Sequence, residues 1–220
     1  MKMRRYLLGT GLMMMIGLGG ACSHESKYEA ARKTGQQVGE AVATKVQFAD
    51  QFAMLDKKEV ALGKLALKKS SNSQVRAFAH QLIENHEQHL ASLDSYADAS
   101  ALRLAQIDLS TEPGVGGSGG PGSIGVKEAA KKQSAQYDEK LDKQIENFKG
   151  QLRDLSAKSG SEFDKDFLAQ IEKDQKTGTE LTEKGLKEYS DDASLALLLG
   201  RNAPIFERQL EQAKALSASI

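Results

Sequence analysis

The sequence predicts an all-α fold, an antiparallel bundle of four to five helices. Apolar residues recur at intervals of three and four along most of the chain, which is the spacing of one helix face. Abundant Ala, Leu, Lys, Glu and Gln favour helix, and no alternating apolar run bounded by turn residues indicates a strand. With no tryptophan and few aromatic residues, the core must consist mainly of aliphatic side chains and a handful of phenylalanines.

The first 21 residues have the order of a secretory signal peptide: basic residues, an apolar stretch, then small residues. The apolar stretch is too short to span a bilayer, which takes about 20 residues. Cys22, the only cysteine, follows directly, and this arrangement resembles the lipobox of bacterial lipoproteins, although Gly19 stands where a large residue is usual. We therefore expect Cys22 to be lipidated. The alternative is an ordinary signal peptide followed by a free thiol.

The chain that remains after the signal is close to neutral. The signal carries three of the 30 basic residues and no acidic one, which leaves 27 basic against 30 acidic residues. Nucleic-acid binding requires a clustered basic face, so we expect no nucleic-acid partner. Residues 22–44 are polar and carry two glycines in a weak helical pattern, and we interpret them as a tether between the lipid and the bundle.

Residues 45–100 are predicted to form the first helical pair of the bundle. The first helix covers about 45–69, with a break expected near Asp56 because the run from Asp56 to Glu59 has the pattern of a capping box. A second cap signal at 71–74 starts the next helix, which continues to about residue 100. The short connection favours antiparallel packing of the two helices.

Residues 101–125 are predicted to be a linker. Its 113–125 segment has seven glycines in thirteen residues and no charge, the composition of a flexible coil. A connection of this length is typical of the crossover in a ferritin-like bundle. An insertion between adjacent helix ends explains the composition equally well.

Residues 126–217 are predicted to supply the remaining bundle helices. A helix near 127–157 has the cleanest apolar stripe in the chain, and Ser161 starts another that continues to about Tyr189. A last helix follows Ser190. Because Pro204 lies inside its pattern, we expect a kink or break near residues 200–203.

Four polar residues interrupt these apolar stripes, each on a different helix: Glu59, His86, Gln175 and Gln209. A polar side chain in a core costs on the order of 1–3 kcal/mol unless it finds a partner. We therefore expect a shared polar cluster inside the bundle. His89 lies one turn after His86, but Leu90 follows the apolar line better, so His89 is expected near the surface.

Several short segments resemble one bacterial family. They are EVALGKLA at 59–66, GSEFD at 160–164 and APIF at 203–206, and together with the region around His86 they are similar to the ferritin-like domain-of-unknown-function family 4142, labelled predicted outer-membrane protein. The resemblance implies a ferritin-like bundle exported to the periplasm, with no established reaction. It also implies histidines at three points, of which only His86 is present. Gln175 and Gln209 occupy the other two, and this departure counts against a metal site.

The leading hypothesis is a non-catalytic, lipid-anchored protein with a structural, stress-related or interaction role and an unknown envelope partner. It places the protein at the outer membrane, facing the periplasm, since Ser23 is not the aspartate associated with inner-membrane retention. No nucleophilic triad or phosphate loop is present, so no enzyme and no cofactor are expected. The alternative is a single divalent metal ion held by Glu59 and His86, with His89, Asp174 or Glu172 helping. A third hypothesis is self-association through the helix near 127–157.

Overall fold

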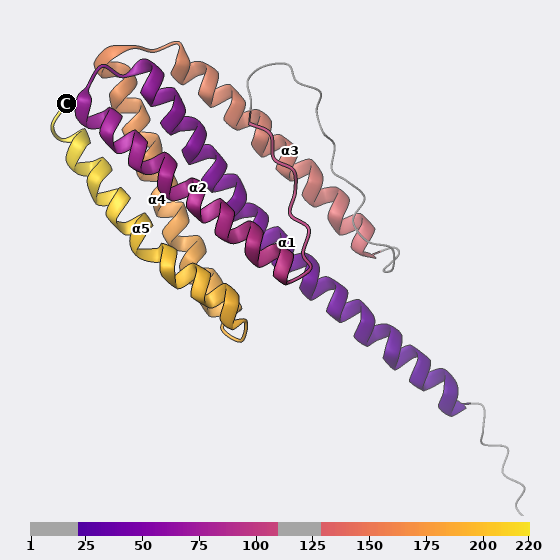
Figure 1. Ribbon diagram of the computed structural model, residues 1–220. Coiled ribbons are helices and arrows are strands. Elements are labelled where there is room, and N and C mark those ends of the chain that lie inside the picture. Colours follow the sequence, from indigo (N-terminus) through magenta and orange to yellow (C-terminus); the bar gives the residue numbers. More distant parts are fainter. Residues whose placement is uncertain (1–21, 110–128) are drawn as a thin grey trace, which may run out of the picture. The chain divides into compact units, whose positions relative to one another are not determined.

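The structure is a computed structural model that describes residues 22–109 and 129–220, with side chains described from residues 33 and 135 onward in the two segments. These residues form five helices and no strand, which confirms the all-α prediction (Figure 1). Residues 39–220 form one compact unit, distinct from residues 1–38, and the bundle described below belongs to it. The predicted signal peptide and the 113–125 segment lie outside the described residues.

The helices are α1 (Cys22–Lys69), α2 (Ser73–Ala99), α3 (Ala129–Ser156), α4 (Gly160–Glu188) and α5 (Ala193–Ser217). α1 begins at Cys22, so residues 22–44, which we interpreted as a tether, are helical. The predicted cap before α2 is present, because the Asn72 side chain accepts hydrogen bonds from the amides of Gln74 and Val75.

The break expected at Asp56 was a wrong prediction. α1 continues through it, because Asp56 is buried inside the helix and its carboxylate is bound by side chains of α2 rather than by helix amides. Likewise α5 continues through Pro204 as one helix, and no break occurs. Leu199 and Phe206, on either side of the proline, are both buried in the core, which keeps the two halves of α5 in place.

We call α1, α2, α4 and α5 the core helices. Among them, α2 and α4 lie parallel. The Phe78 and Phe167 rings meet near the beginnings of α2 and α4, with centroids 6.5 Å apart. Near the other end, the Tyr96 hydroxyl of α2 donates to Asp192, just after the end of α4. α1 and α5 run the opposite way, because Lys45 near the beginning of the buried part of α1 pairs with this same Asp192.

A crossover is needed to join the parallel helices α2 and α4, as in ferritin-like bundles. α3 makes this crossover: it begins at the end of the bundle where α2 ends and runs back along α1 (Figure 1). The Tyr137 hydroxyl near its beginning lies 3.4 Å from the Gln47 carbonyl oxygen. Further along α3, the centroid of the Phe148 ring lies 5.3 Å from Lys58 Nζ. The return is thus helical, whereas one of our two interpretations of the glycine-rich linker was that the linker itself makes the crossover.

The first part of the predicted linker packs against the bundle. Leu102, Ile107 and Leu109 are buried in the core. The Ala105 amide donates to Asp50 Oδ1 at 2.6 Å, and Lys57 Nζ donates to the Ile107 carbonyl at 2.9 Å. Residues 101–109 are therefore attached to α1 by both apolar and polar contacts.

Glycines let aromatic rings approach α4 closely. A Cβ atom at Gly178 would lie 2.4 Å from the Phe206 ring, and one at Gly185 would lie 2.3 Å from the Phe48 ring. Real Cβ atoms do not tolerate such distances, so only glycine fits there. As a result, Phe206 lies deep between the helices, beside the two histidines of α2.

Candidate functional site

A cluster of buried polar side chains lies between the four core helices, and we call it the polar core. The four predicted residues are all in it, and the structure adds three more. Each is at most 3% exposed: Asp56, Glu59, His86, His89, Asp174, Gln175 and Gln209.

Asp56 joins the two histidines of α2. Its Oδ1 lies 2.7 Å from His86 Nδ1 and 2.9 Å from His89 Nδ1. The prediction that His89 lies near the surface was wrong, because this bond and the edges of the Phe52 and Phe206 rings hold it in the core. A signal for Asp56 was present in the sequence, since it lies three residues before Glu59 on the same helix face.

His86 connects α2 with the two C-terminal core helices. Its Nε2 lies 3.1 Å from Gln209 Oε1 of α5 and 3.5 Å from Gln175 Nε2 of α4. The structure therefore brings three of the four predicted residues into direct contact. The imidazole links all four core helices, since its other nitrogen faces Asp56 of α1.

Glu59, the fourth predicted residue, is completely buried, yet neither of its carboxyl oxygens has a hydrogen-bond partner among the described residues. Burial, followed by the nearby charge of Asp174, raises the pKa of Glu59 well above its ordinary value of 4.5, and the Lys58 ammonium offsets only part of this. Burial therefore favours the protonated, neutral form of Glu59.

Asp174 has an ion-pair partner. Its Oδ1 accepts a hydrogen bond from Lys58 Nζ at 2.7 Å, and its Oδ2 accepts one from Gln170 at 2.9 Å. Glu172, which we considered as an additional ligand, instead accepts a hydrogen bond from Ser217 near the end of α5.

A ferritin-like fold implies a metal centre built from one Glu on each of two helices and Glu-x-x-His on each of two others. The side chains present do not fit that centre. Ile83 lies three residues before His86, and α4 and α5 carry Gln175 and Gln209 instead of histidines. Over the described ranges, no group of three or more His, Cys, Asp or Glu side chains is arranged to hold an ion.

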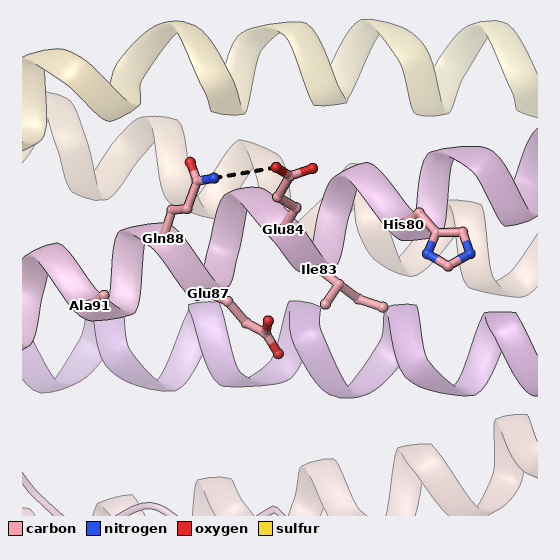
Figure 2. A pocket seen from close by; sticks show the side chains of 6 residues that line it. All are labelled: His80, Ile83, Glu84, Glu87, Gln88 and Ala91. Carbon is pink, nitrogen blue, oxygen red and sulfur yellow. Dashed lines mark hydrogen bonds between the residues drawn. The ribbon is translucent and has the colours of Figure 1, made fainter.

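A shallow hollow on the outer side of α2 is a separate feature. Figure 2 shows its lining of His80, Ile83, Glu84, Glu87, Gln88 and Ala91. Glu84 and Gln88 are hydrogen-bonded to each other, and Glu87 pairs with Lys64 of α1 at 2.9 Å. These groups are exposed, whereas the side chains of the polar core are buried, and the polar core remains the stronger candidate.

Among the described residues, no helix combines the length and the apolarity that a membrane span requires. Cys22 is the first residue of α1.

A family model matches residues 30–114 and 124–216, the greater part of the chain. The nine residues between the two segments, 115–123, belong to the glycine-rich stretch. No curated protein and no solved structure matches the sequence significantly. The two matched segments contain all five helices of the bundle in large part and every residue of the polar core. The chain therefore belongs to the family described as domain of unknown function DUF4142.

Proposed function

We propose that the protein is a lipid-anchored helical bundle of the cell envelope, attached through Cys22, with a non-catalytic structural or interaction role. The observation that carries the proposal is the position of the only cysteine, directly after a segment with the composition of a signal peptide. In a secreted protein a single cysteine has no partner within its own chain, and lipidation accounts for it.

Strong anchoring follows from the chemistry of acylation. One acyl chain gives only reversible binding, whereas further chains add about 0.8 kcal/mol per buried CH₂ group. A multiply acylated Cys22 would keep the protein on the membrane. Ser23 favours the outer membrane, with the bundle facing the periplasm.

The burial of the polar core supports a non-catalytic role. A catalytic group must reach its substrate, but His86, Asp56 and Gln209 are each at most 2% exposed and are bonded to one another. Their contacts stabilise the interior of the bundle. Recognition of an envelope partner would then fall to the outer surface.

The test is a Cys22→Ser variant of the full chain, expressed in a bacterium that processes lipoproteins and labelled with a radioactive fatty acid. We expect label and membrane association for the parent chain, and neither for the variant. Ser23→Ala is the matched control, which should retain both. A Cys22→Ser protein that stays in the membrane fraction would overturn the proposed anchor.

A further inference from the structure

The charge of the polar core is balanced by its own side chains. Asp56 is completely buried, and a buried carboxylate is strongly unfavourable unless a cation or hydrogen-bond donors compensate for it. Its Oδ1 faces two imidazole nitrogens, those of His86 and His89, at 2.7 and 2.9 Å. Both histidines thus direct Nδ1 toward a carboxylate.

The surroundings of His86 indicate its protonation state. The partner of its Nδ1 is Asp56 Oδ1 at 2.7 Å. The nearer partner of its Nε2 is Gln209 Oε1 at 3.1 Å, and the Gln175 amide nitrogen lies farther away at 3.5 Å. A neutral imidazole can donate from only one nitrogen, whereas the doubly protonated ring donates from both. A doubly protonated His86 would donate to both of these oxygens, and its positive charge would neutralise Asp56.

His89 requires only one proton. Its Nδ1 donates to Asp56, and its Nε2 has no hydrogen-bond partner in the described part of the chain. The ring lies edge-on against Phe52 and Phe206, with centroids 5.6 and 6.0 Å away. A second proton, on Nε2, would have no acceptor among the described residues.

The remaining charges also cancel. Asp174 pairs with Lys58 at 2.7 Å. Glu59, buried without a donor among the described residues, is neutral in its protonated form. With Asp56 paired to the His86 imidazolium and a proton on Glu59, the polar core has no net charge, and a divalent ion could enter without adding charge only by displacing the protons of both His86 and Glu59.

We infer that the polar core is independent of metal: the Asp56-bridged histidine pair takes the structural role that a metal ion has in a ferritin-like bundle, and a proton on His86 supplies the positive charge. This inference does not depend on the proposed lipid anchor, because it concerns only the interior of the bundle.

The first test compares two substitutions of His89, each of which places an amide nitrogen near the position of a different ring nitrogen. Asparagine places its amide nitrogen where Nδ1 lies, so His89→Asn keeps the donor to Asp56. Glutamine places its amide near the position of Nε2 and loses that donor. For the full chain in detergent, we expect His89→Gln to lower Tm by at least about 3 °C more than His89→Asn. The reverse order would overturn the inference.

The second test uses metals directly on the same purified chain. We expect Tm to stay within about 1 °C when Fe²⁺, Mn²⁺ or Zn²⁺ is added and when EDTA is added. Stoichiometric metal that survives purification, together with a lower Tm after its removal by EDTA, would overturn the inference even if the histidine variants fail to fold.

The third test is ¹⁵N NMR of the histidine side chains at pH 7. We expect protons on both nitrogens of His86 and on Nδ1 alone of His89. In Asp56→Asn, the signals of both rings should change. A neutral His86, with the Gln209 amide reversed so that it donates to Nε2, would refute the assignment of the proton.

Discussion

Asp56 and Glu59 lie less than one turn apart on α1, and both are completely buried. Asp56 has two imidazole donors from α2, at 2.7 and 2.9 Å. Glu59 has no donor among the residues that the structure describes, and its carboxyl group lies close to the negative charges of Asp174 and Asp56.

The comparison shows that burial alone does not decide whether a carboxyl group is charged. Asp56 gains compensation from donors on another helix, so its negative charge is stabilised in the interior. Glu59 has only partial compensation from Lys58, and burial together with the charge of Asp174 raises its pKa, which favours the neutral form. We expect replacement of each carboxyl group by an amide to have opposite consequences at the two positions.

The largest expected effect is that of Asp56→Asn. The amide has one acceptor oxygen and no charge, so the His86 and His89 donors lose much of their partner inside the core. Breaking a buried pair in this way costs about 3–5 kcal/mol. Urea unfolding followed by circular dichroism measures the loss. If the free energy of unfolding falls by less than about 1 kcal/mol, the replacement of Asp56 has as little effect on stability as the replacement of Glu59, and the contrast between the two residues is refuted.

Gly178→Ala should destabilise the protein by disturbing the packing around His86 and His89, the partners of Asp56. The new Cβ atom would lie 2.4 Å from the Phe206 ring, which contacts both histidines. Overpacking of this kind costs about 1–3 kcal/mol. The control is Gly200→Ala on α5, where a Cβ atom meets nothing within 4 Å. Alanine should stabilise that helix by about 0.5–1 kcal/mol, so equal destabilisation of both variants would contradict the packing explanation.

The smallest effect, with the opposite sign, is expected for Glu59→Gln. The pKa of Glu59 is raised in the folded state, so folding retains a proton that the unfolded chain releases above pH 4.5. The free energy of unfolding of the parent chain should therefore decrease as pH rises from this value toward the folded-state pKa. Glutamine has no such proton to lose.

The measurement is the free energy of unfolding of Glu59→Gln and of the parent chain at pH 5 and pH 8. We expect the variant to gain stability relative to the parent at the higher pH, because the parent must take up a proton at Glu59 on folding and this uptake becomes less favourable as pH rises. Identical dependence on pH in the two proteins would mean that Glu59 is not the group that titrates.

Much of the fold could be predicted from the sequence, because the apolar stripes follow the helical period directly. The cap signal at 71–74 correctly placed the beginning of α2, since Asn72 satisfies local amides. The capping-box pattern at Asp56, by contrast, led to the wrong prediction of a helix break. The same residues that cap a helix locally can also bind distant side chains, and the local pattern does not reveal which partner is nearer.

The polar core was predictable only in part. Glu59, His86, Gln175 and Gln209 interrupt apolar stripes, and this alone indicated that they are buried. His89 does not interrupt an apolar stripe, so its burial was not predicted. The adjacent Leu90 fits the stripe better, and the two side chains point about 100° apart around the helix axis. Which of them faces the interior depends on α1, where Asp56 offers an acceptor for His89.

The sequence by itself determined that this chain is helical, which faces of its helices are apolar, and which cysteine follows the signal-like segment. These properties depend on residue type and short-range spacing. Only the tertiary structure decided that α3 makes the crossover and that Asp56 joins His86 to His89. Partners 30 or more residues apart meet only after the helices have packed, and the protonation of a buried group depends on those partners.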